Sequence, residues 1–165
     1  MALGDIQILE SNNGFGINGS VRYAVAASAT LINAGEPVAK VLGNASGNVV
    51  APASTNTPVV GTDFYAGIAA STSTNTASAA GVVDVFPMDT KTVYLISPKV
   101  AASWDTQAEY DALVGARVLL DLTSSTYTIL AADGSTYGCV VMPLNIATYP
   151  GKVAFAFRAG VNFLA

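Results

Sequence analysis

The sequence contains no histidine and a single cysteine among its 165 residues. The absence of histidine removes the commonest general base, the commonest metal ligand and the base of Ser-His and Cys-His nucleophile pairs. A single cysteine excludes a disulfide framework within the chain and a zinc site built from several cysteines. Cys139 lies in the apolar run 138–142, which predicts a small buried side chain. We therefore expect no enzyme, no metal site and no cofactor.

Charge is also scarce. Charged residues make up 11% of the chain, against about 25% in a typical soluble domain. The seven cationic residues are scattered, with no two adjacent, at Arg22, Lys40, Lys91, Lys99, Arg117, Lys152 and Arg158. Binding to nucleic acid or to an anionic membrane needs clustered Lys and Arg, so the sequence argues against both partners. A surface with so few charges suits burial against copies of the chain or a larger assembly.

The sequence lacks a long hydrophobic run, although its mean hydropathy is +0.48. The longest apolar stretch, residues 23–32, is interrupted by Ser and Thr and is shorter than the roughly 20 residues that span a bilayer. The first residues carry no Lys or Arg ahead of Asp5 and Glu10, which is unlike a signal peptide. We expect a protein that is made in a cytoplasm and stays soluble or is assembled there.

What the sequence does contain is a series of short strand patterns. The first alternates apolar Val21, Tyr23 and Val25 with other residues. Further patterns occupy residues 64–70, 82–86, 92–96, 116–122, 126–131, 137–142 and 152–158. One helix is predicted over residues 106–114, capped by Asp105 and ended by Gly115. The sequence therefore predicts an all-β, mostly antiparallel, barrel-like or sandwich-like single domain with one short helix and an extended N-terminal arm.

The arm is predicted over residues 1–20. Residues 1–10 form a short strand pattern, and residues 11–20 are nearly all turn formers with two Asn-Gly pairs. The β-rich domain then occupies residues 21–165. Within it, residues 43–61 and 71–81 are predicted as long loops rich in Ser, Thr and Asn, and the sequence leaves open whether they are ordered.

Residues 14–19 match the G-x-G-x-x-G spacing of a dinucleotide-binding loop. That function needs a strand running directly into the glycines, a helix after them and an acidic residue about 20 positions further on. Here residues 11–13 separate the strand from the glycines, and Glu36 stands directly before Pro37 in a turn. We therefore interpret the motif as a glycine-rich hinge.

The residues around the predicted helix are the strongest candidates for metal binding, catalysis or ligand stacking. Asp105, Glu109 and Asp111 could hold a hard cation or serve acid-base catalysis. Acidic residues also gather at helix N-termini because of the helix dipole, and we favour this interpretation. Trp104 is interpreted as a core anchor, with stacking on a sugar, together with Tyr110, as the alternative.

Four short motifs follow one another along residues 35–158, the last of them before the final strand. They are Gly35-Glu36-Pro37-Val38, Gly67-Ile68-Ala69, Val83-Asp84-Val85 and Gly151-Lys152-Val153. This order resembles the small bacteriophage capsid decoration, or cement, proteins. Their sequences run from a G-D/E-P-V turn through a G-I/V-A strand and a V-x-V strand to a late G-x-V and a final strand. The resemblance implies a barrel-like, often trimeric protein without enzymatic activity. It implies a place on the outer surface of the phage capsid, with the major capsid protein and copies of the chain as partners.

The predicted arm supplies a binding mode. An apolar segment behind a glycine-rich hinge can add as a strand to the edge of a capsid sheet, where its side chains enter pockets. The predicted capsid-binding arm residues are Leu3, Ile6, Ile8, Leu9 and Phe15. The alternatives to a decoration protein are a tail-tube or other self-assembling minor virion protein, and a carbohydrate- or receptor-binding β-domain.

Overall fold

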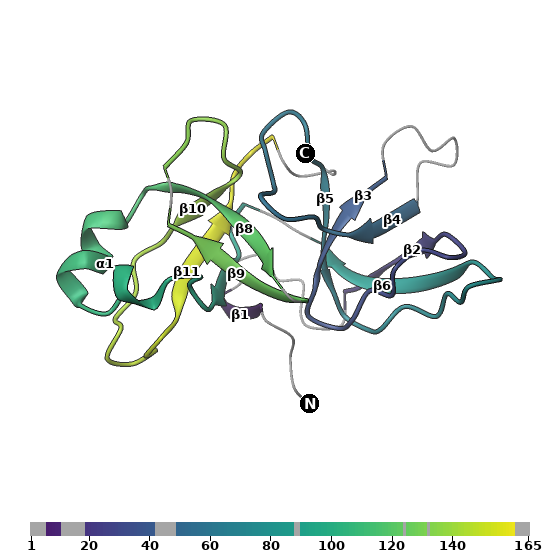
Figure 1. Ribbon diagram of the computed structural model, residues 1–165, viewed down its shortest axis with the longest axis horizontal. Helices are drawn as coiled ribbons and strands as arrows, with labels where there is room; N and C mark the ends of the chain where they lie inside the picture. Colours follow the sequence, from purple (N-terminus) through teal and green to yellow (C-terminus); the bar gives the residue numbers. More distant parts are fainter. Residues whose placement is uncertain are drawn as a thin grey trace.

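The computed structural model describes residues 6–10, 19–41, 49–87, 90–123, 125–131 and 133–160. These residues form two adjoining β structures, a closed five-stranded barrel and a six-stranded sheet, together with one short α-helix (Figure 1). The predicted fold class, a mostly antiparallel all-β domain with one short helix, is confirmed. The choice between barrel and sandwich is also settled, because one of the two structures is a closed barrel.

The barrel closes in the order β2-β4-β3-β5-β6. Its strands are β2 (Val21–Val25), β3 (Pro37–Lys40), β4 (Val49–Pro52), β5 (Tyr65–Ala69) and β6 (Gly81–Pro87). β2 pairs with β6 in antiparallel and with β4 in parallel orientation, which closes the ring. The interior is narrow and filled by buried side chains, namely Tyr23, Val25, Ile32, Val38, Val50, Ala66, Ala69, Val83 and Val85. Valine suits both the pleated strands and the small volume.

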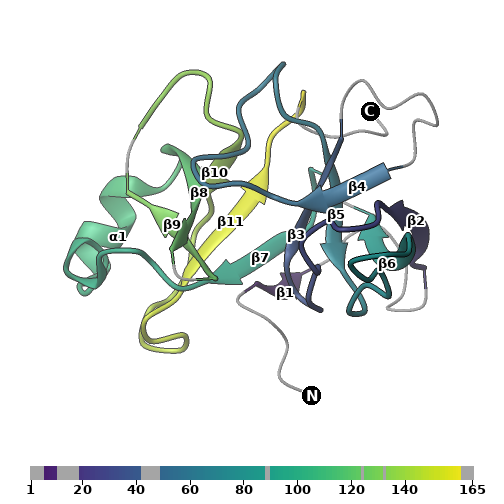
Figure 2. The ribbon, with the colours of Figure 1, turned by 45° about the vertical axis from the view of Figure 1, so that its right-hand side comes forward.

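The sheet has the strand order β1-β7-β11-β10-β8-β9. Its strands are β1 (Gln7–Glu10), β7 (Val93–Ile96), β8 (Arg117–Thr123), β9 (Thr126–Leu130), β10 (Cys139–Val141) and β11 (Val153–Phe157). Tyr94, Phe155 and Phe157 pack together in its core, with ring centroids 5.4–5.5 Å apart, a spacing at which aromatic rings attract. The 3₁₀ turn η1 (Ala101–Ser103) and the helix α1 (Gln107–Leu113) connect β7 to β8. Figures 1 and 2 show α1 at the end of the molecule away from the barrel.

β5 contributes to both cores. Tyr65 and Ile68 pack in the sheet core, whereas Ala66 and Ala69 fill the barrel. A bulge opposite β3 produces this change of face: Gly67 pairs with Val38 and Tyr65 with Ala39, so Ala66 is the extra residue, and the neighbouring Gly67 has a φ of +151°. A Cβ at this position would lie 1.9 Å from a backbone oxygen of β6, so only glycine fits.

Residues 53–60 tie the barrel to the sheet. The Leu120 amide in β8 donates a hydrogen bond to the carbonyl oxygen of Thr57 at 2.8 Å. The Gly138 amide likewise donates to the carbonyl oxygen of Pro58 at 2.7 Å. The segment therefore lies beside β8, and the two β structures form one domain.

Three local features differ from the sequence-based expectations. β4 lies inside the predicted loop 43–61 and is paired with β2 and β3. The sequence does not predict this strand, because it is only four residues long and turn-forming residues surround it. Residues 71–80 are mostly exposed, as expected, but they are held in place by polar side chains. The buried Ser73 hydroxyl accepts a hydrogen bond from the Ile32 amide at 3.0 Å, and the Asn75 amide group donates to the Ala29 carbonyl oxygen at 2.8 Å. These contacts order the low-complexity segment.

The cap of α1 is Thr106, one residue after the predicted Asp105. Thr106 accepts a hydrogen bond from the Glu109 amide, and the Glu109 carboxylate accepts one from the Thr106 amide, which makes a capping box. Gly115, with φ of +86°, follows the helix where the sequence predicts its end. Among the described residues, no helix has the length and hydropathy needed to cross a membrane.

Candidate functional site

The segment predicted to bind a capsid lies partly within the sheet. Ile6 is only 2% exposed and belongs to the sheet core, against which Leu9 also packs. β1 pairs with β7 in antiparallel orientation, with Ile8 opposite Tyr94. Residues 6–10, which the sequence assigns to an arm, are thus a strand of the domain. Leu3, Phe15 and the side chain of Ile8 lie outside the described part of the chain.

β1 is the last strand at one edge of the sheet. The opposite edge, β9, is covered, because the Lys99 amide donates to the Ile129 carbonyl oxygen at 2.9 Å and the Ile129 amide donates to Ser97 at 3.0 Å. Among the described residues, no strand pairs with the outer side of β1. An edge strand of this kind can accept a strand from another chain while it keeps its own partner.

The acidic residues near α1 do not form a catalytic or metal-binding cluster within the described residues. Glu109 raises the pKa of Asp105 through a hydrogen bond and charge repulsion, while the hydroxyl of Thr106 lowers the pKa of Glu109. Within the described ranges, no three His, Cys, Asp or Glu side chains gather closely enough to hold a metal ion. Of these residues, Glu109 takes part in the cap of α1, whereas Asp105 precedes the cap and Asp111 accepts a hydrogen bond from Gln107.

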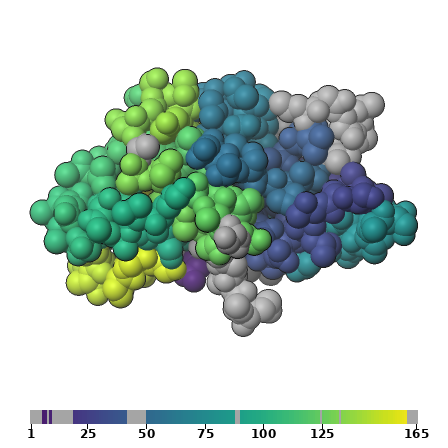
Figure 3. Space-filling view, viewed as in Figure 1, coloured from purple at the N-terminus to yellow at the C-terminus, as the bar shows by residue number. Residues whose placement is uncertain are grey.

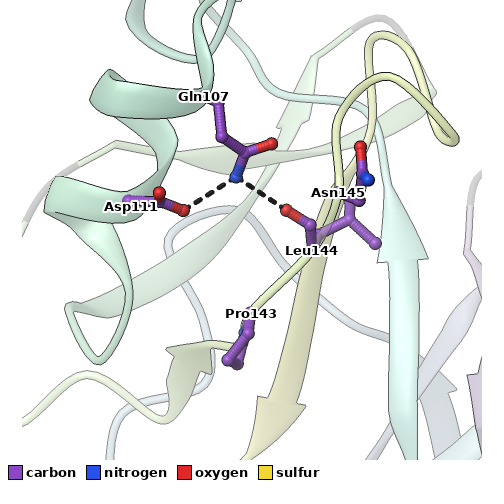
Figure 4. A pocket seen from close by; sticks show the side chains of 5 residues that line it. All are labelled: Gln107, Asp111, Pro143, Leu144 and Asn145. Atoms are coloured by element: carbon purple, nitrogen blue, oxygen red, sulfur yellow. Dashed lines mark hydrogen bonds between the residues drawn. The ribbon is translucent and has the colours of Figure 1, made fainter.

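A shallow, open depression lies between α1 and residues 143–145 (Figure 4). Gln107 crosses it, with its amide nitrogen donating to Asp111 Oδ1 at 2.7 Å and to the carbonyl oxygen of Leu144 at 3.0 Å. Its amide oxygen accepts a hydrogen bond from the Ile146 amide at 3.1 Å. Gln107 therefore fastens α1 to the loop, and all its hydrogen-bonding atoms are used within the protein.

Trp104 and Tyr110 are core residues. Trp104 is 4% exposed and Tyr110 is fully buried, and their rings meet edge to face with centroids 5.7 Å apart. The Tyr110 hydroxyl donates to the Met142 carbonyl oxygen and accepts from the Ala154 amide, both at 2.9 Å. The ring of Tyr110 cannot stack on a sugar, so the carbohydrate-binding alternative loses one of its two residues. The prediction that Trp104 anchors the core agrees with its burial.

An ion pair joins the buried carboxylate of Asp121 in β8 to the half-exposed Lys99, and sequence reasoning missed it. Lys99 Nζ lies 2.8 Å from Asp121 Oδ1, and the Asp121 side chain is only 6% exposed. The hydroxyl groups of Thr55 and Thr123 also donate to this carboxylate, at 3.2 and 2.7 Å. The hydrogen bond from Lys99 is the main reason that the pKa of Asp121 is lowered. An acidic residue inside the apolar run 116–122 was the available sequence signal.

Two further predictions concern single features. Cys139 is fully buried, as predicted, and burial raises the pKa of its thiol well above the usual value. Residues 14–18 of the glycine motif lie outside the described residues, and the element that follows them is the strand β2 rather than a helix. A dinucleotide-binding loop needs a helix at that place.

Comparison with known proteins does not assign the chain to a family. No family model matches it, and neither the curated proteins nor the solved structures contain a matching chain.

Proposed function

We propose that this chain is a structural, non-enzymatic virion protein that binds the outer surface of a phage capsid and stabilises the head as a trimer. The proposal starts from the resemblance to capsid decoration proteins over residues 35–158. Its partners would be the major capsid protein and further copies of the chain.

The observation that carries the proposal is the position of the motifs in the barrel. The Gly35 amide donates to the Ala69 carbonyl oxygen, and the Ala69 amide donates to the Glu36 carbonyl oxygen, both at 2.8 Å. Ala69 also lies opposite Val85 in the β5–β6 pair. Three motifs that are far apart in the sequence thus adjoin one another, and they include the turn at Gly35 (φ +85°) and the bulge beside Gly67. Three of the four motifs that resemble those of the decoration proteins therefore lie in the barrel, and the fourth, residues 151–153, leads into β11 of the sheet.

Charge supports an outer position. The chain has a net charge of −4 and no cluster of cationic residues along the sequence. A protein on the inner face of a filled head would meet concentrated phosphate, which binds basic surfaces and repels acidic ones. An acidic protein is better placed outside the shell.

Stabilisation would follow from many weak contacts. A subunit that bridges neighbouring capsomers binds its second contact at a high effective concentration, so modest individual affinities add up across an oligomer. In this arrangement the outer edge of β1 and the residues before it would supply a strand-pairing contact to the shell. The contacts of Leu3, Ile8 and Phe15 with a capsid remain a prediction.

Co-sedimentation with capsids that lack decoration tests the proposal. A deletion of residues 2–15 would remove β1 and the buried Ile6, so it would test folding as well as binding. Deletion of residues 2–5 leaves both in place. We expect the full chain to sediment with capsids, and the shorter deletion to reduce binding without changing the melting temperature.

The control is the exposed substitution Val100→Ala, which should leave capsid binding unchanged. Failure of the full chain to bind capsids, or its assembly into tubes by itself, would contradict the proposal. Full binding by the deletion variant would show that residues 2–5 do not contact the capsid.

A further inference from the structure

A narrow cleft lies beside η1, at the end of the molecule away from the barrel. It shares no residue with the depression of Figure 4, and its volume is about 190 Å³. In Figure 3 the blue-green segment around η1 and α1 lies beside the yellow segment that leads into β11. A cleft of this size holds one side chain rather than a drug-sized ligand. Its walls are mostly apolar and consist of Pro98, Ala101, Trp104, Asp105, Ile146, Pro150 and Gly151.

The indole N–H of Trp104 has no hydrogen-bond acceptor among the described residues, although the residue is only 4% exposed. Buried N–H groups are nearly always paired, so an orphan of this kind indicates an acceptor that comes from outside the chain. Trp104 otherwise packs in the sheet core and against Tyr110, so the cleft is the side from which an acceptor can approach. A carbonyl oxygen is one such acceptor.

One wall of the cleft carries negative charge. Asp105 lines the cleft, and its carboxyl group is hydrogen-bonded to that of Glu109, which repels it when both are ionised. Within the described part of the chain, neither carboxylate pairs with a cation. A cation bound beside the two groups would relieve their repulsion, because an opposite charge favours the ionised form of both.

The lysines that adjoin the cleft walls in the sequence do not supply this cation. Residues 100–116 contain no Lys or Arg. Lys99 Nζ lies 2.8 Å from an oxygen of Asp121, and Lys152 Nζ donates to the Ser97 hydroxyl at 3.2 Å, so both lysines are held elsewhere. A cation at the two carboxylates therefore has to come from another molecule.

We infer that the cleft binds a lysine or arginine side chain of a partner polypeptide. The methylene stem lies along the apolar walls, the cationic head reaches Asp105, and a backbone carbonyl of the partner accepts from the indole N–H of Trp104. The indole nitrogen is covered in the unbound chain, so part of the wall shifts as the carbonyl binds.

A sugar fits the cleft less well than a basic side chain. Its hydroxyl groups would be buried against Pro98, Ile146 and Pro150, whose side chains offer no hydrogen-bond partners. The methylene stem of Lys or Arg needs no such partners. The inference does not depend on the proposed function, which assigns no ligand to this cleft.

Nuclear magnetic resonance of the nitrogen-15-labelled full-length chain tests the inference. The chain has a single tryptophan, so its spectrum contains one indole N–H signal, from Trp104. The probes are tripeptides with blocked ends that carry Lys, norleucine or Glu between two alanines. At neutral pH the Lys peptide should shift this signal to saturation and bind about tenfold more tightly than the other two. Raising the salt from about 0.05 M to about 0.5 M should weaken its binding, because salt screens the charges.

n-Butylammonium has the cationic head and methylene stem of Lys but no carbonyl group. It should bind more weakly than the Lys peptide, because the indole N–H of Trp104 gains no acceptor from it. Equal binding by n-butylammonium would overturn the assignment to a polypeptide in favour of a free amine.

Asp105→Asn should weaken binding of the Lys peptide about tenfold and leave the norleucine peptide unaffected. Asp111→Asn is the matched control, because it removes one carboxylate from α1 at a residue that does not line the cleft. It should change the affinity for the Lys peptide by less than about twofold. Thermal melts establish that both variants are folded. An indole signal that the Lys peptide leaves unmoved, equal binding of the Lys and norleucine peptides, or equal losses in the two variants would each overturn the inference.

Discussion

At the scale of single residues, Gly67 lies where β5 changes from packing in the sheet core to packing in the barrel core. The bulge beside it lets Tyr65 and Ile68 face the sheet while Ala66 and Ala69 fill the barrel. A side chain at this position meets the backbone of β6, and no rotamer can relieve that clash.

Gly67→Ala should therefore destabilise the protein by about 2 kcal/mol or more, through strain and overpacking. Gly115→Ala is the control, because Gly115 has a positive φ of +86° but no atom within 4 Å of its Cβ position. It should cost about 1 kcal/mol, from backbone conformation alone. Urea denaturation measures both, and an equal loss in the two variants would contradict the account of the bulge.

Asp121 connects three parts of the chain through one buried carboxylate. Lys99, Thr55 and Thr123 all donate to it, and Thr55 comes from the segment that leaves the barrel. Asp121→Asn should cost about 1–2 kcal/mol at neutral pH, because the charged hydrogen bonds are lost while the half-exposed Lys99 regains solvent. Asp84→Asn, which breaks the exposed pair with Arg22, should cost clearly less.

The pH dependence of stability follows from the lowered pKa of Asp121. A carboxyl group whose pKa is lower in the folded state stabilises the protein fully above its unfolded pKa of about 3.9. This contribution is lost as the pH falls from that value through the folded pKa. The difference in stability between wild type and Asp121→Asn should therefore shrink in acid. A difference that stays constant between neutral and acidic pH would contradict the charged role of Asp121.

Among the elements, the stability of β1 in the sheet decides whether residues 6–10 stay in the domain or form a free arm. The strand is short, but Ile6 before it is almost fully buried in the sheet core. Ile6→Ala should cost about 2–5 kcal/mol, as for other buried aliphatic residues. The exposed Val100→Ala should change stability by less than about 0.5 kcal/mol. Wild-type stability of Ile6→Ala would show that β1 leaves the sheet readily and acts as a free arm.

The helix α1 depends on its capping box. Thr106→Ala should destabilise the protein by about 1 kcal/mol, because the Glu109 amide loses its acceptor. Asp105→Ala should have a smaller effect, since Asp105 precedes the cap and repels Glu109. Thermal denaturation of the two variants separates them. A larger loss from Asp105→Ala would restore Asp105 as the cap.

For the whole molecule, the sequence predicts where strands lie along the chain better than which strands pair with one another. The alternation of Val21, Tyr23 and Val25 is a local property, and β2 follows it. The division into a barrel and a sheet depends instead on pairings between distant segments, such as β2 with β4 and β1 with β7. Local patterns carry no record of those pairings, so the sequence left barrel and sandwich open.

In the predicted site, too, local properties could be predicted from the sequence and contacts between distant segments could not. The burial of Cys139 and Trp104 could be predicted, because an isolated thiol in an apolar run and a lone indole usually pack in a core. The position of Ile6 could not, since a short apolar segment at a chain end pairs equally well with its own sheet or with another protein. Asp121 was missed because its partners Lys99 and Thr55 are distant in the sequence.

Cryo-electron microscopy of phage capsids assembled with and without this chain tests the proposed function most directly. The account predicts density for the barrel and the sheet on the outer surface of the capsid, repeated with the symmetry of the shell. Particles made without the chain should lack this density and withstand heating less well. Density confined to the tail, or no change in the capsid when the chain is absent, would contradict the account.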